Sequence, residues 1–446
     1  MLSTLVTCFS CEKMLEVDLP DNQMLSETVF SDAQTANATL TGLYAGLWES
    51  SPVSGDQSGR LLSLYTDDLS YYALNATNGL PELASNTLID SNQLVTSFWT
   101  AAYQKVYVSN SILEGLEYSS SISTAEKNRM KGEALVIRSL LFFYLQQVYG
   151  DIPYPVTTNY LINQTITKTP SAEVLDRITY DLEEASVLLS DQYRHAERIY
   201  INKKTAELLL AKIKMHQMKW SEAETLLKKV IQSPLYQFQN DITKVFAKSG
   251  SHIIWQLKPK NSGDPVREAT IYYFANVAPA TMSLSPSLIS SFNTGDLRKQ
   301  HWMAPVTVAG NTWYRAEKYK MRSANTTENS IVFRLEEAYL LLAEALAQQN
   351  KISEALPFIN PIRQRAAQPL LQNTVSQQVL LNEILNENRK EFFTEMGHRF
   401  LDLKRAGKLN LLLPVKPNWK TDHQRWPIPQ KELLLNPQLN PQNSGY

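Results

Sequence analysis

The sequence lacks the residues and patterns on which several classes of function depend. Both of its cysteines, Cys8 and Cys11, lie near the start of the 446 residues, so the body of the chain has no thiol for a disulfide, a thiolate metal site or a nucleophile. Glycine is sparse, at 15 residues, and no Gly-x-Gly-x-x-Gly or phosphate-loop pattern occurs. The six histidines are scattered without a His-Glu-x-x-His motif. We therefore expect no cofactor, no metal site and no nucleotide-binding fold.

A charge excess and a long apolar run are also missing. The 43 basic and 44 acidic residues give a net charge of −1, which provides no electrostatic basis for binding nucleic acid. No run of 18 apolar residues occurs, so no transmembrane helix is predicted. Asp67 and Asp68 are adjacent carboxylates, but glycoside hydrolysis needs two carboxylates that flank one bond, and adjacency alone is weak support for it. We predict no catalytic residues and no enzymatic activity.

The most informative stretch that is present runs from Glu383 to Arg405. Its apolar residues form one broad stripe at helical spacing, which predicts an amphipathic helix with one buried face. Glu387, Glu391 and Glu395 follow one another at intervals of four residues, with arginines among them. Because an unpaired buried charge is costly, these groups are predicted to form structural ion pairs rather than a catalytic site.

The sequence from Glu387 to Arg405, ENRKEFFTEMGHRFLDLKR, resembles the signature of the SusD/RagB family, which are outer-membrane nutrient-binding lipoproteins of Bacteroidetes. The motif YGDIP at residues 149–153 and the C-terminal stretch that begins WPIP at residue 426 are similar to further motifs of that family. Two departures are visible, because Asn388 stands where the family usually has an arginine and Met396 where a tryptophan is common. The resemblance covers nearly the whole chain.

The resemblance implies a mostly α, SusD-like scaffold, and the helical patterns agree with it. We expect a single domain over residues 21–446. Pairs of short helices with the spacing of tetratricopeptide repeats are predicted within residues 98–232 and 335–366. Residues 258–329 show no clear helical period and are rich in aromatic residues, which argues against disorder. They are predicted to be a long irregular insert that binds the ligand.

Aromatic residues also recur along the predicted helix that begins near residue 98, at Trp99, Tyr103 and Tyr107. Their spacing of four residues places them on one face of that helix. Large side chains on one face of a helix usually pack into the core. We therefore expect all three rings to face inward.

Residues 1–20 are predicted to be the end of a signal peptide, a lipidation site and a tether. Residues 1–10 are short, apolar and uncharged, as in the later part of a signal peptide. By the family resemblance Cys11 is the lipidated cysteine, and Cys8 is a rival of poorer fit. Several acyl chains on one cysteine would hold the protein firmly on a membrane.

Two segments supply the candidate ligand-binding residues. Residues 61–84 carry aromatic and amide side chains on a predicted loop, where stacking faces and amide donors suit ligand contact, although packing of the tyrosines onto the core is an equally good interpretation. The insert supplies further aromatic residues, whose flat faces suit sugar rings. The predicted ligand-binding residues are Asp67, Tyr71, Tyr72, Asn75, Tyr273, Trp302, Trp313 and Tyr314.

The resemblance implies a lipid-anchored protein of the cell outer membrane that faces the exterior, captures oligosaccharide and delivers it to a SusC-like TonB-dependent transporter. Two alternatives stay open. The RagB branch of the family handles oligopeptides, and a tetratricopeptide scaffold would bind a protein partner. An exposed aromatic platform would favour glycan, whereas a narrow groove with unpaired backbone groups would favour peptide.

Overall fold

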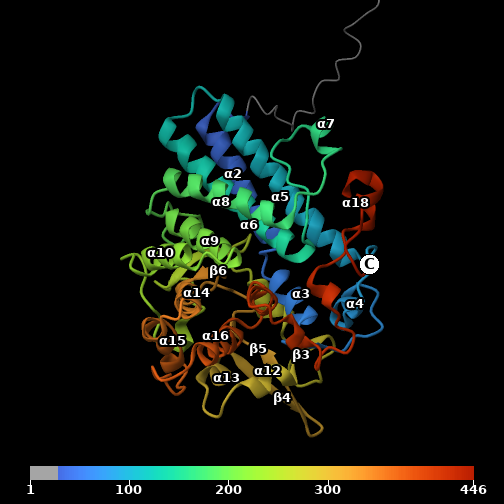
Figure 1. Ribbon diagram of the computed structural model, residues 1–446, viewed down its shortest axis with the longest axis vertical. Coiled ribbons are helices and arrows are strands. Elements are labelled where there is room, and N and C mark those ends of the chain that lie inside the picture. The colour runs from blue at the N-terminus through green and yellow to red at the C-terminus, as the bar shows by residue number, and fades with distance from the viewer. Residues whose placement is uncertain (1–28) are drawn as a thin grey trace, which may run out of the picture.

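The computed structural model describes residues 29–446, and a stack of helices forms its main body (Figure 1). In chain order the helices of the stack are α5 (Gln93–Tyr118), α6 (Thr124–Tyr149), α8 (Ser171–Leu188), α9 (Lys203–His216), α10 (Trp220–Ile231), α14 (Leu335–Gln348), α15 (Ile352–Arg365) and α16 (Gln377–Phe392). Each packs against the one before it, and α14 packs directly on α10 although a long segment of chain separates the two. The predicted mostly α architecture is confirmed.

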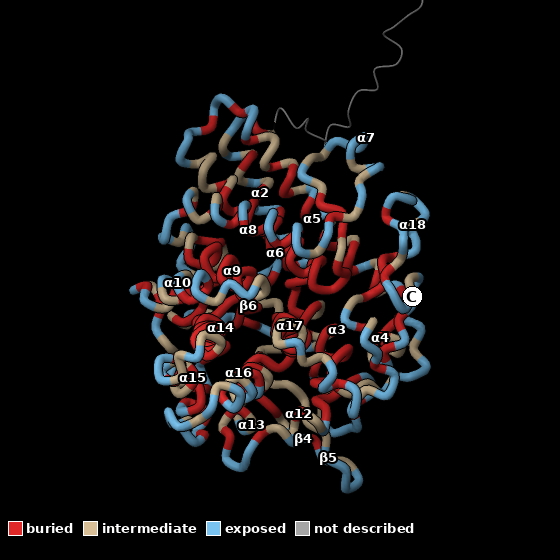
Figure 2. Tube along the Cα trace, viewed as in Figure 1, coloured by how far each residue is buried: buried red, intermediate tan, exposed pale blue. Residues whose placement is uncertain are grey.

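Helix α6 runs through the middle of the upper part of the molecule, where the buried residues gather (Figure 2). The hydroxyl of Ser123 caps its start by accepting a hydrogen bond from the Glu126 N–H. Every residue from Gly132 to Tyr149 is buried, so this part of the helix is packed against other elements on all sides. Gly150 ends it with a φ of 83°, a left-handed conformation that glycine adopts without a Cβ clash.

The pairs α9–α10 and α14–α15 are the helix pairs that the tetratricopeptide spacing predicts. Ala211 and Ala223 are fully buried where α9 meets α10, and Ala345 and Ala355 are fully buried where α14 meets α15. Small side chains at these positions let the two helices of each pair approach closely. The two pairs meet through α10 and α14.

Further helices and six strands surround the stack. The remaining helices are α2 (Ala33–Glu49), α3 (Ser58–Tyr65), α4 (Leu80–Ser85), α7 (Tyr160–Asn163), α11 (Arg267–Ile271), α12 (Pro286–Ser291), α13 (Leu297–His301), α17 (His398–Arg405) and α18 (Gln430–Leu435). The strands are β1 (Leu69–Tyr71), β2 (Ile253–Leu257), β3 (Met282–Leu284), β4 (Met303–Val308), β5 (Asn311–Ala316) and β6 (Ser330–Arg334). They form a four-stranded antiparallel sheet in the order β1-β3-β5-β4 and an antiparallel pair of β2 with β6.

The segment 258–329, which we expected to be irregular, is more ordered than that. It contains the strands β3, β4 and β5 and three short helices. Ala309 and Gly310 join β4 to β5, and their φ angles of 50° and 81° are those of a two-residue turn whose twist matches paired strands. Elements of three to six residues are too short to show a period in the sequence, which is why the pattern looked irregular.

The carboxylates of α16 take part in a buried network of ion pairs, as the sequence predicts. Glu387 and Glu391 are fully buried, and Arg298 Nη1 lies 2.6 Å from a Glu387 oxygen. Arg334 Nη1 lies 2.6 Å from a Glu391 oxygen, and Arg365 pairs with the same oxygen. The arginines come from α13, β6 and α15, so the network ties these three elements to α16.

A lysine and a further carboxylate extend this network. The ammonium group of Lys318 pairs with Glu395 and donates hydrogen bonds of 2.8 Å to the carbonyls of Glu391 and Phe393. Burial lowers the pKa of Lys318 to about 8 in spite of Glu395. Asn388, at the position of the missing arginine, donates instead to the Ile384 carbonyl at 3.0 Å.

The predicted lipidation site Cys11, the rival Cys8 and the tether lie outside the described residues. Within residues 29–446, no helix combines the length and the apolar character needed to cross a membrane.

Candidate ligand-binding site

The four-stranded sheet joins the two sequence segments in which ligand contacts were predicted. Strand β1 comes from residues 61–84, and it pairs with β3 from the insert. The N–H of Tyr72 extends this pairing by donating to the Thr281 carbonyl at 2.8 Å. Strand β5, which carries Trp313 and Tyr314, pairs with the other side of β3.

Two tyrosines and two arginines form a cluster beside this sheet. The Tyr72 hydroxyl lies 2.9 Å from the Ser283 hydroxyl, and 39% of Tyr72 is exposed. The guanidinium groups of Arg315 and Arg322 lie 4.7 Å and 3.7 Å from the centre of the Tyr273 ring, and 45% of Tyr273 remains exposed. We call Tyr72, Ser283, Tyr273, Arg315 and Arg322 the tyrosine–arginine cluster.

Hydrogen bonds hold the two arginines of this cluster in place. Arg315 donates to the Phe274 carbonyl at 2.6 Å and to Glu317 Oε1 at 2.7 Å. Arg322 donates to the same Glu317 oxygen at 3.0 Å. Arg315 follows Tyr314, the partner of Leu284, so its side chain and that of Ser283 leave the same face of the sheet. Exposed ring faces and fixed donors therefore share one surface.

A cleft of about 460 Å³ borders the opposite, free edge of β1. Its lining includes Asp67, Leu69, Tyr71, Leu74 and Lys416. The ladder bonds of β1 come from alternate residues, since the Ser285 N–H donates to Asp68 and the Tyr72 N–H to Thr281. The backbone groups of Leu69 and Tyr71 therefore point away from β3 and toward the free edge.

Asp67 is mainly an ion-pair partner in this arrangement. Burial would raise the pKa of its carboxyl, but the charges of Arg389 and Arg399 outweigh burial and hold the pKa below its usual value. Asp67 Oδ2 lies 2.9 Å from Arg389, and Oδ1 lies 2.8 Å from Arg399. The adjacent Asp68 also pairs with Arg389, at 2.9 Å, so the two carboxylates anchor α16 and α17 to the start of β1.

The structure corrects the prediction that Trp302 contacts the ligand. It also shows how far Tyr314, Trp313 and Asn75, three other predicted ligand-binding residues, are exposed. Trp302 is 1% exposed, and its indole N–H donates to the Ile242 carbonyl at 3.0 Å, so it offers no face to a ligand. Tyr314 packs partly against the core beneath Lys299. Trp313 is half-buried on β5, and Asn75 is exposed on the loop after β1.

Sequence reasoning did not find Arg315, Arg322 and Ser283. Arginine and serine are common in any loop, and only the pairing of strands shows that they meet the tyrosines. The position of Arg315 directly after Trp313 and Tyr314 was the one available signal. Within residues 29–446, no group of three or more His, Cys, Asp or Glu side chains is arranged to hold a metal ion.

Comparison with known families agrees with the sheet and helix arrangement. A family model described as starch-binding, associating with the outer membrane, matches residues 14–215, and the model of the SusD family matches residues 257–412. The chain belongs to the SusD/RagB family. This is a family of outer-membrane, glycan-binding proteins, so the SusD-like chain is a binding protein and not an enzyme.

Individual relatives of this SusD-like protein are distant but match over nearly its full length. The SusD-like protein P25 of Formosa agariphila is 24% identical, over 99% of this chain and 97% of that protein. A SusD superfamily protein from Bacteroides vulgatus matches with a TM-score of 0.80 at 20% identity, over 94% of this chain and 100% of that one. Surface glycan-binding protein A from Bacteroides thetaiotaomicron, solved in complex with laminarihexaose, matches with a TM-score of 0.77 at 17% identity, over 92% and 99%. At these identities the likeness establishes the shared fold.

Proposed function

We propose that this protein captures oligosaccharide at the tyrosine–arginine cluster on the outer surface of the cell. The observation that carries the proposal is that two exposed tyrosine rings lie on one sheet surface and that fixed arginine donors stand beside one of them, Tyr273. Sugar rings stack on aromatic faces, and their hydroxyls accept hydrogen bonds from guanidinium groups. The laminarihexaose complex of a relative with the same fold supports a glucan as the first ligand to test.

The test is calorimetric titration of the folded chain with laminari-oligosaccharides and a panel of other glycans. Tyr72→Ala and Tyr273→Ala should each weaken binding by roughly tenfold or more, as is usual for an aromatic anchor in a binding site. Tyr180→Ala is the matched control, because Tyr180 is exposed on α8, away from the sheet. Unchanged affinity in both cluster variants would contradict this assignment.

A peptide ligand is the second candidate, and the free edge of β1 favours it. An extended peptide adds to a sheet by pairing with such an edge, and the 460 Å³ cleft beside Leu69 and Tyr71 leaves space for one. Mixed oligopeptides belong in the same titration. Leu74→Glu, which places a charge in the cleft at an exposed residue, should weaken peptide binding and leave glycan binding unchanged.

We also propose that Cys11 carries the lipid anchor and that the bound ligand passes to a SusC-like TonB-dependent transporter. The family resemblance of the sequence around Cys11 supports the first proposal, and the family's association with the outer membrane supports both. In cell fractionation, Cys11→Ala should move the protein out of the outer-membrane fraction, whereas Cys8→Ala should not.

Co-purification of a barrel-forming transporter with the tagged wild-type chain tests the partnership.

A further inference from the structure

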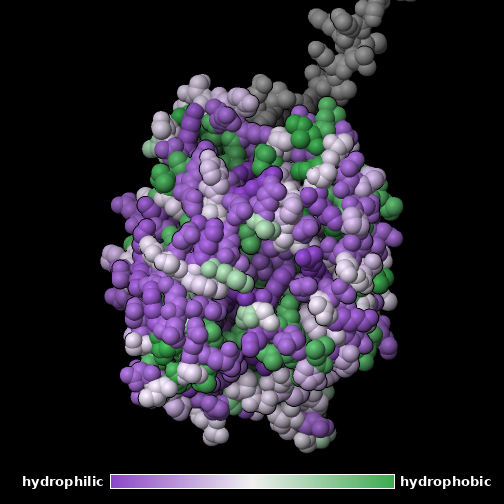
Figure 3. Space-filling model, viewed as in Figure 1, coloured by the Kyte–Doolittle hydropathy of each residue, from purple (hydrophilic) through white to green (hydrophobic). Residues whose placement is uncertain are grey.

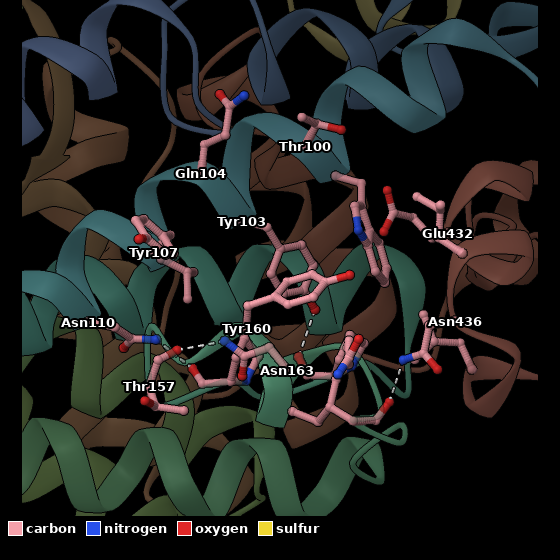
Figure 4. A pocket seen from close by; sticks show the side chains of 18 residues that line it. Thr100, Tyr103, Gln104, Tyr107, Asn110, Thr157, Tyr160, Asn163, Glu432 and Asn436 are labelled. Carbon is pink, nitrogen blue, oxygen red and sulfur yellow. Dashed lines mark hydrogen bonds between the residues drawn. The ribbon is translucent and has the colours of Figure 1, made fainter. Parts of the chain in front are cut away.

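A second pocket lies far from the sheet, between α5, α7 and α18 (Figures 1 and 4). Its volume is about 410 Å³, within the range of small-molecule sites. Figure 4 shows Tyr103 and Tyr107 reaching it from α5, Tyr160 from α7 and Glu432 from α18. We call it the α5–α18 pocket.

Aromatic rings make up much of its wall. Four aromatic residues, Trp99, Tyr103, Tyr107 and Tyr160, line the pocket. The buried Trp99 and the half-buried Tyr103 form the floor, with ring centres 4.7 Å apart. Tyr107 and Tyr160 are 56% and 72% exposed and stand at the mouth. Tyr107, which we expected to face inward, therefore belongs to this surface and not to the core.

None of these four rings is covered by a cation from the described part of the chain. Elsewhere in the molecule the protein places its own arginines and lysines over tyrosine rings, as Arg194 does over Tyr200 at 3.5 Å. The negative face of an aromatic ring attracts a cation, most strongly where water is displaced. The four rings of the α5–α18 pocket thus make no cation–π contact with a side chain of residues 29–446.

Glu432 is the one charged side chain among the residues of the described chain that line the pocket. Within residues 29–446 its carboxylate forms no ion pair and accepts no hydrogen bond. Burial raises the pKa of Glu432, with a smaller opposing effect from neighbouring Lys431. Burial also raises the pKa of Tyr103, and the charge of Glu432 raises it further, so the carboxylate interacts electrostatically with Tyr103 in the floor of the pocket. A partly desolvated carboxylate without a counter-ion is unfavourable until a cation arrives.

We propose that the α5–α18 pocket binds a small organic cation, an amine or quaternary ammonium compound, between its aromatic rings and the Glu432 carboxylate. The rings supply cation–π attraction and apolar contact for the substituents on nitrogen. The Glu432 carboxylate supplies the negative charge that pairs with the cationic nitrogen. A neutral apolar ligand would gain only the apolar contact, and a neutral sugar would leave the carboxylate without a counter-ion.

The surroundings favour a small ligand that enters from solvent. Exposed apolar side chains flank the mouth, and Figure 3 shows a hydrophobic area over α7. Leu435 is exposed and lines the pocket, and Leu161 and Ile162 are exposed directly after Tyr160 on α7. They would cover the substituents of a bound ammonium compound and exclude water from the ion pair.

The experiment compares choline with its neutral isostere, in which a quaternary carbon replaces the nitrogen, using saturation-transfer NMR and calorimetry on the purified chain. Choline should bind about tenfold or more tightly than the isostere, because shape and apolar area are the same and only the charge differs. Equal binding of the two, or no choline binding, would overturn the proposal.

Two variants locate the site. Glu432→Gln should weaken choline binding by about tenfold and leave the isostere unaffected, whereas Glu354→Gln, at an exposed glutamate on α15, should change neither. Tyr160→Leu keeps apolar bulk but removes the ring, and it should weaken choline binding, with Tyr180→Leu as its equally exposed control. Choline affinity that survives both pocket variants would contradict the assignment. Tyr273→Ala should leave choline binding unchanged, which separates this site from glycan capture.

Discussion

Arginines and carboxylates gather in two places in this protein, with opposite surroundings. Beneath α16, Arg298, Arg334 and Arg365 are buried and pair with Glu387 and Glu391. Beside the sheet, the arginines of the tyrosine–arginine cluster are only partly buried, and their planes lie near a tyrosine ring. The guanidinium groups beneath α16 are thus enclosed among carboxylates, whereas those beside the sheet share one carboxylate, Glu317, and stay partly exposed next to a tyrosine ring, where we propose that they contact a ligand.

The largest expected effect comes from Glu391, which contacts three arginines of the buried network. Glu391→Gln keeps the shape of the side chain but removes its charge, so the arginines are left with excess positive charge in the core. We expect a loss of about 3–5 kcal/mol in the free energy of unfolding, measured by urea denaturation. The exposed control Glu354→Gln should stay within about 0.5 kcal/mol of wild type. A small loss for Glu391→Gln would show that the network adds little net stability.

The next effect separates the aromatic residues of the core from those of the proposed site. Trp302→Ala removes a fully buried indole and its hydrogen bond to Ile242, and should lower the free energy of unfolding by about 3–5 kcal/mol. Glycan affinity of the folded variant should not change. If Trp302→Ala instead abolished binding without a loss of stability, the site would have to include this residue.

The two regions differ in how much the sequence alone predicts. The helices α5, α9, α10, α14 and α15 follow from periodic patterns, because each depends on neighbours three or four residues apart. The spacing of the α16 carboxylates predicts that they are paired, but their partners Arg298, Arg334 and Arg365 lie far away in the sequence. The tyrosine–arginine cluster depends on strands of three to six residues that pair across long separations in sequence. No local pattern encodes such a pairing, so Tyr72 and Tyr273 could be proposed as site residues but not placed together.

Aromatic residues show the same limit of prediction from sequence. Trp302 and Tyr273 both lie in the insert, yet one is core and the other surface. Trp99, Tyr103 and Tyr107 share one helix face; helical spacing correctly predicts that Trp99 is buried, whereas Tyr103 packs against the core but is only half-buried. Tyr107 is exposed at the α5–α18 pocket, which also includes residues from α7 and α18. Burial at such a position is decided by distant segments.

Glu268 differs from the carboxylates of the network around α16, because it is buried but has no arginine partner in residues 29–446. The Ser330 hydroxyl donates to one of its oxygens, and burial raises its pKa to about 7. The folded state thus favours the protonated form of Glu268 more than the unfolded state does. The contribution of this protonation to the free energy of unfolding is full below pH 4.5, the usual pKa, and is lost as the pH rises through about 7.

Replacement of this side chain by a neutral one should remove that pH dependence. At pH 8, Glu268→Gln should be more stable than wild type by roughly 3 kcal/mol, and at pH 4 the two should be nearly equal. Urea denaturation at the two pH values measures the difference. Equal gains at both would mean that the effect comes from packing and not from ionisation.

The smallest expected effect tests whether an arginine beside a ring serves the ligand or merely the fold. Arg322 stacks on Tyr273 and donates to Glu317, and both contacts lie at the surface, where a charge pair adds little stability. Arg322→Lys keeps the charge but loses the flat guanidinium that lies against the ring. If the cluster binds glycan, affinity should fall by about two- to fivefold while the unfolding free energy stays within about 0.5 kcal/mol, because the ring loses its support but not its contact area. A loss of stability with unchanged affinity would place Arg322 with the buried arginines, as part of the scaffold, and would leave Arg315 as the arginine that orders the site.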